Sequence, residues 1–253
     1  MTQETVDGSD SNETRSIMIR KHRWFAAASG LAAMVALAGC GSSATTTSTT
    51  AGGAQALKGV FRLTPGSTGS SGVTGSYLRM INPGGTVKSG PFFLNPDSAS
   101  SDKSYTLVSP GTAGGLVTDS YQPDPSPSFD AKGNALAGAI IAPQAFVALD
   151  FSISTNPTDP QSKLAVPKPT ISVERGILTG QVEAVTVAWN NQYFNQGSPK
   201  PGGGSPGLTA PVSGAYDAST RAFVLTWASQ VVGGPFNGFT GYWHLQGTFS
   251  PAG

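Results

Sequence analysis

Short runs in which apolar and polar residues alternate recur along this chain, and they constrain its fold more than any other feature. In 145–153, Val147, Leu149 and Phe151 share one parity and Asp150 has the other. Because successive residues of a β-strand point to opposite faces, such a run buries one face and leaves the other polar. We therefore predict strands at 145–153 and at three similar runs, 60–64, 184–189 and 223–227.

Turn-forming residues separate these runs. Asn82-Pro83-Gly84-Gly85 and Glu174-Arg175-Gly176 are typical of tight turns, whereas 198–211 is too rich in Pro and Gly to pair and is expected to be an exposed loop. No segment after residue 40 shows a sustained apolar stripe with helical period. The pattern predicts an all-β fold, a single antiparallel β-sandwich or barrel-like domain over residues 57–253. Further turns are expected at 95–97, 131–134, 156–160 and 216–221.

Charged residues are sparse and balanced, with 15 Lys and Arg against 14 Asp and Glu and a formal net charge of +1. The two signs alternate along the chain, so no basic stripe is available to neutralise phosphate groups. Nucleic acid is therefore not an expected partner.

The first 40 residues follow the order of a secretion signal. A basic cluster at 20–23 precedes an uncharged apolar segment at 24–38, which is shorter than the ~20 residues of a membrane-spanning helix. The segment closes on Leu37-Ala38-Gly39-Cys40, and Cys40 is the only cysteine of the chain. This site resembles the lipobox of bacterial lipoproteins.

The resemblance implies that Cys40 receives a diacylglyceryl group, that cleavage follows Gly39 and that the mature chain begins at Cys40. Two acyl chains hold a protein stably at a bilayer. We expect 1–39 to be leader and signal peptide, with Met18 as an alternative start, and 40–56 to be the lipidated cysteine and a flexible Ser/Thr/Gly tether. The expected location is the extracytoplasmic face of the cell membrane.

The closing segment, 227–249, joins a glycine-rich stretch at 233–238 to the aromatic run Tyr242-Trp243-His244. It is similar to the closing segment of uncharacterised exported bacterial proteins. The resemblance implies a secreted β-rich module and brings no catalytic residue.

Known catalytic patterns fit this chain poorly. The letters G-x-S-x-G at 203–207 match a hydrolase nucleophile elbow, but Pro206 and the neighbouring glycines do not fit its strand–turn–helix context. A glycosidase needs two carboxylates across a cleft, and Glu174 and Glu183 are the only glutamates after Cys40. Since Glu174 adjoins Arg175 in a turn, an ion pair is expected there. We expect no enzymatic activity and no cofactor.

Three aspartates form a weak candidate for a metal site. Asp119, Asp124, Asp130 and Asn134 all lie in one Pro-rich segment of 16 residues, 119–134. Carboxylate and amide oxygens are the ligands that Ca²⁺ prefers. Because the spacing matches no known calcium loop, a Pro-rich acidic loop without metal is the favoured interpretation.

The strongest ligand candidate is an aromatic and amide cluster. If the strand at 184–189 continues, Trp189, Asn191, Tyr193 and Asn195 share one face, where rings would stack on sugar C–H surfaces and amides would bind hydroxyls. The favoured interpretation is simpler: a core tryptophan that ends its strand, followed by a polar turn. His244 is a second candidate, since its parity opposes that of Trp243 and directs it to solvent or a groove.

These features favour a membrane-anchored extracytoplasmic lipoprotein that is a non-enzymatic binding or structural module of the cell envelope. The alternatives are a carbohydrate-binding module and a secreted hydrolase with an unrecognised site. The expected partners are the membrane, through the lipid anchor, and a glycan or another envelope protein.

Overall fold

Period-two patterning produces a structure built of strands. The computed structural model describes residues 53–203 and 209–253, and these contain strands, connections and one 3₁₀ turn, η1 (Pro201–Gly203), but no α-helix. Every strand pairing among them is antiparallel. The all-β prediction is therefore confirmed. Three of the predicted strands are β2 (Gly59–Leu63), β13 (Val185–Trp189) and β16 (Ala222–Gln230).

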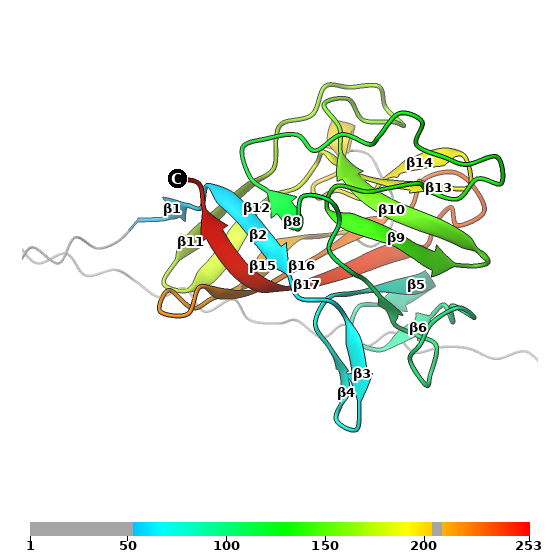
Figure 1. Ribbon diagram of the computed structural model, residues 1–253, viewed down its shortest axis with the longest axis horizontal. Helices are drawn as coiled ribbons and strands as arrows, with labels where there is room; N and C mark the ends of the chain where they lie inside the picture. The colour runs from blue at the N-terminus through cyan, green and yellow to red at the C-terminus, as the bar shows by residue number, and fades with distance from the viewer. Residues whose placement is uncertain (1–52, 204–208) are drawn as a thin grey trace, which may run out of the picture. The chain divides into compact units, whose positions relative to one another are not determined.

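The larger sheet curls into a half-barrel (Figure 1). Its strand order is β1-β11-β12-β15-β16-β17-β2-β8, and β5 joins it through β17. The long strand β17 (Thr240–Pro251) pairs with β5 through its first residues and with β2 through its last. The other members are β1 (Gln55–Ala56), β5 (Tyr77–Thr86), β6 (Gly90–Phe92), β7 (Thr106–Leu107), β8 (Gly115–Val117), β11 (Thr170–Glu174), β12 (Ile177–Gln181) and β15 (Ala210–Tyr216).

A smaller sheet packs against the larger one through a shared hydrophobic core. Its order is β14-β13-β10-β9, with β9 (Ile141–Phe146), β10 (Leu149–Thr155) and β14 (Gln192–Asn195) beside β13. Phe61, Leu225 and Trp243 of the larger sheet and Ile141 and Ile153 of the smaller are fully buried. A separate hairpin, β3 (Ser67–Gly69) and β4 (Gly72–Thr74), projects from this body (Figure 1).

The outer face of the smaller sheet is covered by the long connection 118–140. Ser152 Oγ donates to the backbone oxygen of Ala137 (2.8 Å), and Ser154 Oγ accepts from the backbone N–H of Ala139 (3.2 Å). Residues on both faces of β10 are therefore buried. The polar side chains on its outer face form hydrogen bonds with the backbone of the covering loop instead of with water. This covering loop forms one wall of the site described below.

The predicted single strand at 145–153 is wrong. β9 ends and β10 begins on either side of Val147 and Ala148, which form a two-residue hairpin turn with φ of 53° and 62°. Alternation runs unbroken through the turn, and a β-branched residue such as Val rarely adopts a positive φ. Neither the alternation pattern nor the residue types at 147 and 148 therefore indicate a turn here.

A distant loop supports this unusual turn. The side chain of Asn95 accepts a hydrogen bond from the N–H of Val147 (3.3 Å), and that of Asp97 accepts one from Ala148 (2.7 Å). The turn therefore depends on tertiary contacts.

Two predicted connections also differ from the structure. The turn expected at 82–85 lies inside β5, where the register with β6 shifts between Ile81 and Thr86. The loop expected at 198–211 begins with a buried residue, Ser198, and ends inside β15. The turns at 174–176 and 216–221 are confirmed as the connections between β11 and β12 and between β15 and β16.

Strand pairing begins at Gln55, inside the segment expected to be tether, since β1 pairs with β11. The motif Leu37-Ala38-Gly39-Cys40 and the rest of the tether lie outside the described residues. Within the described ranges, no helix has the length and hydrophobicity required to cross a membrane.

Candidate functional site

The outer side of the smaller sheet carries an open polar groove of about 400 Å³, here called the Tyr193 groove. Strands β13 and β14 contribute Thr186 and Tyr193, and the covering loop contributes Asp124 and Ser128. The connection after β10 closes the groove with Asn156, Thr158, Asp159, Pro160 and Lys163.

Tyr193 supplies the aromatic surface of this groove. It is 38% exposed, and its ring centroid lies 5.2 Å from that of Phe129. In β14, Tyr193 pairs with Ala188, whereas its neighbour Phe194 is buried on the inner side of the sheet. The pleat thus holds the Tyr193 ring outward while Phe129 limits its movement.

Two carboxyl groups line the groove, and each has one oxygen that lacks a hydrogen-bond donor. Asn156 Nδ2 donates to Asp124 Oδ2 (2.8 Å), and the backbone N–H of Ser162 donates to Asp159 Oδ2. Among the described residues, no donor reaches Oδ1 of Asp124 or of Asp159, and both oxygens are buried. Burial raises the pKa of the Asp124 carboxyl.

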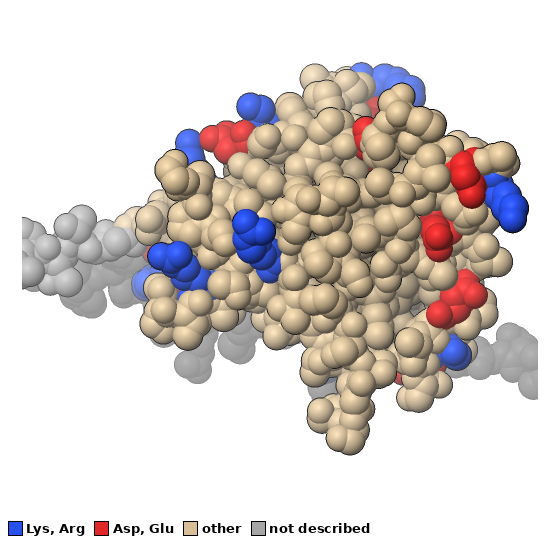
Figure 2. Space-filling view, in the orientation of Figure 1, with Lys and Arg blue, Asp and Glu red and all other residues tan. Residues whose placement is uncertain are grey.

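Two lysines place positive charge near these carboxyl groups. Lys163 Nζ donates to the backbone oxygen of Pro160 (2.6 Å) at the rim. Lys200 is further inside, where its ammonium donates to the backbone oxygen of Asn195. Burial lowers the pKa of Lys200 to about 8, although the charge of Asp159 opposes this shift. Over the view in Figure 2, charged side chains are scattered and form no continuous patch.

The structure separates most of the residues predicted to share a face with Tyr193. Asn190 and Asn191, with φ of 51° and 56°, form a hairpin turn between β13 and β14, so the strand does not continue. Trp189 is buried, and its indole N–H donates to the backbone oxygen of Phe146 (3.0 Å). The shared-face prediction is wrong for Trp189 and Asn191, because a two-residue turn starts a new strand. The favoured interpretation, a core tryptophan followed by a polar turn, is confirmed at these positions. Asn195 has the same parity as Tyr193 in β14 and pairs with Thr186.

Asn191 and Asn195 have different surroundings. Asn191 is exposed at the turn, whereas Asn195 is buried and its side-chain amide donates to the backbone oxygen of Glu183 (2.7 Å). Burial raises the pKa of Glu183. The side chain of Asn195 therefore stabilises the backbone behind the groove through this hydrogen bond.

His244 lies on the outer face of the larger sheet, in a separate cluster. Its ring stacks on that of Tyr77 with centroids 4.5 Å apart and 4° between the planes. The predicted parity is confirmed, because Trp243 and Leu245 are buried on the opposite face. Burial lowers the pKa of His244, which favours the neutral ring.

The aspartates considered as metal ligands are not assembled into one site. Asp119 pairs with Lys58 (3.0 Å), and this contact lowers the pKa of Asp119. Asp130 accepts from the Asn134 side chain (2.8 Å), which lowers its pKa, while Asp124 lines the Tyr193 groove. In the part of the chain that the structure describes, no group of three or more His, Cys, Asp or Glu side chains could hold a metal ion.

The other sequence patterns add nothing to the groove. Glu174 pairs with Arg175 (3.1 Å), which confirms the predicted ion pair. Most of the G-x-S-x-G match at 203–207 lies outside the described residues.

Asp159 and Thr186 are groove residues that the sequence analysis missed. Asp159 lies in a stretch interpreted only as a turn, Asn156-Pro157 to Asp159-Pro160. The signal available was an aspartate between two prolines, which predicts a loop position and does not identify its neighbours. Thr186 has the same parity as Ala188, opposite Trp189, and this places it on the groove side.

Comparisons with known proteins provide no relative for this chain: no family model, no curated protein and no solved structure matches it. The resemblances of the signal and of the closing segment stay predictions.

Proposed function

We propose that this chain is a lipid-anchored extracytoplasmic module that binds a carbohydrate in the Tyr193 groove. The observation that carries the binding proposal is one exposed aromatic ring beside two carboxyl groups, Asp124 and Asp159, in a single open groove. The lipobox ending at Cys40 supports anchoring at the outer face of the membrane.

Carbohydrates match both parts of the groove. Their C–H faces stack on aromatic rings, and their hydroxyl groups donate hydrogen bonds. Hydrogen bonds from a hydroxyl group to a carboxylate are charge-assisted and stronger than those between neutral groups, so a groove that holds Asp124 and Asp159 suits a ligand rich in hydroxyls. At the walls, Thr158 can donate to or accept from further hydroxyls, and Ser128, whose hydroxyl donates to the backbone oxygen of Pro125 (2.7 Å), can accept from them.

The test is binding of the full chain, carrying Cys40→Ser, to purified peptidoglycan and capsular polysaccharide. Tyr193→Ala should weaken the binding at least tenfold, about 1.4 kcal/mol, because the stacking surface is lost. Tyr193→Phe should bind as the parent does, since it keeps the ring.

The matched control is Ile177→Ala, which removes a side chain that is 58% exposed on β12 and does not line the groove. Equal binding by the parent, Tyr193→Ala and Ile177→Ala would remove the groove from consideration.

A second candidate function is hydrolysis of the bound glycan. It is favoured by the presence of two carboxyl groups, Asp124 and Asp159, in the same groove, since glycosidases use a pair of carboxyl groups; burial raises the pKa of Asp124, the direction that a general acid requires. Release of new reducing ends during the binding incubations would assign hydrolysis, and their absence would leave binding alone.

A further inference from the structure

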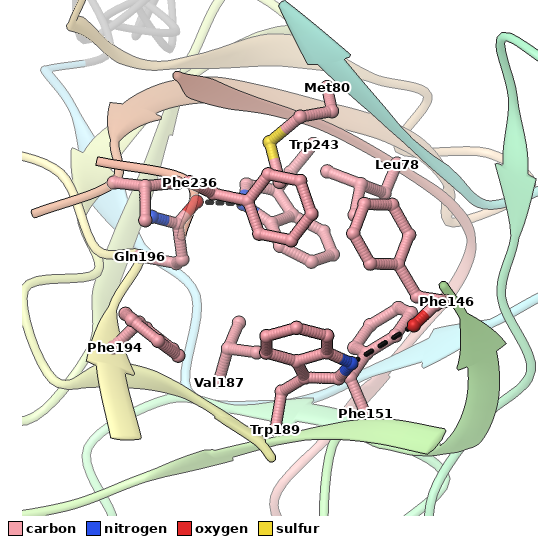
Figure 3. A pocket seen from close by; sticks show the side chains of 11 residues that line it. Leu78, Met80, Phe146, Phe151, Val187, Trp189, Phe194, Gln196, Phe236 and Trp243 are labelled. Carbon is pink, nitrogen blue, oxygen red and sulfur yellow. Dashed lines mark hydrogen bonds between the residues drawn. The ribbon is translucent and has the colours of Figure 1, made fainter. Parts of the chain in front are cut away.

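A second cavity, of about 40 Å³, lies between the two sheets, independent of the Tyr193 groove (Figure 3). Strand β5 contributes Leu78 and Met80 to its wall, and β13 contributes Val187. Gln196 and Val231 also line it, and six aromatic rings form the rest of the wall, those of Phe146, Phe151, Trp189, Phe194, Phe236 and Trp243.

The polar groups of the wall already have partners. The Trp189 indole donates to the backbone oxygen of Phe146 (3.0 Å), and the Trp243 indole donates to Gln196 Oε1 (3.4 Å) (Figure 3). The Gln196 amide nitrogen in turn donates to the backbone oxygen of Asn195 (3.1 Å). Since an ordered water needs two to four polar partners, this cavity offers little to water and suits an apolar group.

Phe236 is the part of the wall that meets solvent. It lies on the connection between β16 and β17 and is only partly buried, whereas Trp189 and Trp243 are buried. Its ring meets those of Phe146 (5.3 Å, 62°) and Trp189 (5.5 Å, 60°) edge to face. The chain thus holds a phenyl ring of its own over the cavity.

The size of the cavity defines how a ligand would enter. An apolar cavity of ~150 Å³ binds benzene, so the closed cavity here is too small for a ring. Rotation of Phe236 outward would vacate the volume of one phenyl ring above the void. An entering ring would regain the edge-to-face contacts with Phe146 and Trp189 and fill the space that Phe236 leaves empty.

We propose that this cavity binds an aryl group, which displaces the Phe236 ring from its mouth. The occupant is argued from the phenyl ring that already sits there and from the aromatic lining. The displacement lowers the affinity of the parent protein, because only molecules with Phe236 outward are competent to bind.

The test is a ¹⁹F NMR titration of the full chain, carrying Cys40→Ser, with fluorobenzene. The parent should bind saturably, and Phe236→Ala should bind at least tenfold more tightly, because the competing ring has been removed. Contacts between ligand protons and the Trp189 and Trp243 rings, seen as nuclear Overhauser effects, should locate the ligand.

Phe92→Ala is the matched control, since Phe92 is a partly buried phenylalanine that contacts Arg79 and lies outside the cavity wall. It should bind fluorobenzene as the parent does. Near-ultraviolet circular dichroism of each variant checks that the core remains packed.

Absence of saturable binding by both the parent and a folded Phe236→Ala would overturn the proposal. Tighter binding of n-hexanol than of fluorobenzene by Phe236→Ala would also overturn it, in favour of an alkyl occupant. Val187→Leu, which keeps an aliphatic side chain and reduces the void, should weaken fluorobenzene binding; unchanged binding would place the ligand elsewhere.

Discussion

Tyr77 and His244 show how single side chains on the outer face of the larger sheet are shielded from water without entering the core. The ring of Tyr77 stacks on His244 and meets that of Tyr105 edge to face at 5.0 Å. Arg79 lies on the same strand, with its guanidinium 4.2 Å from the Tyr105 ring centroid. Burial raises the pKa of Tyr77 to about 12, with further contributions from Tyr242 and Tyr105.

This shift predicts a loss of stability in alkaline solution. Between the ordinary tyrosine pKa of 10 and the folded value of about 12, the unfolded chain releases a proton that folded Tyr77 retains. The stabilisation is therefore complete below pH 10 and is lost as pH rises toward 12. In Tyr77→Phe, the urea midpoint should fall less steeply between pH 9 and pH 11 than in the parent.

The exposed Tyr193→Phe should retain the parental alkaline slope and serves as control. If Tyr77→Phe also retained that slope, the ionisation of Tyr77 would not limit stability at high pH.

Glycines inside the strands allow the larger sheet to curl. A Cβ on Gly247 of β17 would lie 1.8 Å from the backbone oxygen of Arg62 in β2, and one on Gly214 of β15 would lie 2.0 Å from that of Val224 in β16. No side chain fits at such distances, so neighbouring strands approach closely only at glycine.

Gly247→Ala should therefore lower the free energy of unfolding by about 2 kcal/mol, a typical cost of overpacking, because backbone must move. Gly69→Ala is the matched control: an added Cβ there, in β3, meets nothing within 4 Å. Urea unfolding curves measure both. A Gly247→Ala midpoint equal to that of Gly69→Ala would show that the sheet accommodates the side chain and that its curl does not depend on this glycine.

At the scale of the molecule, the two candidate ligand sites lie on opposite faces of the smaller sheet. Tyr193 points to the open groove and its neighbour Phe194 to the apolar cavity, since alternate residues of a strand face opposite ways. The predicted lipid anchor at Cys40 would hold both sites outside the membrane.

Attachment through two acyl chains predicts that Cys40→Ser shifts the protein from the membrane pellet to the soluble fraction, because the sulfur that carries the acyl chains is removed. Immunoblots of fractionated cells, together with the intact mass of the purified chain, measure the effect. Membrane association that persists in Cys40→Ser, or an unmodified Cys40 thiol in the parent, would contradict the anchoring proposal.

Much of the fold could be predicted because its signals are local. The alternation around Phe61 and Leu225 defines buried strand faces, and Gly176, with φ of 80°, suits the turn between β11 and β12. The turn at Val147-Ala148 could not be predicted, because its own residues disfavour it and its support comes from Asn95 and Asp97.

The candidate sites, like the turn at Val147-Ala148, depend on contacts between residues that are distant in the chain. By itself the sequence determined the strand class, most turns and the chemistry available, including an aromatic residue at 193 and acidic loops. Only the tertiary structure decided that Asp124, Asp159 and Tyr193 line one groove and that Trp189 faces the opposite way. The reason is physical: alternation specifies which face a residue takes within its own strand, whereas the neighbours on that face are set by sheet order and loop packing, which arise from contacts between residues distant in the chain.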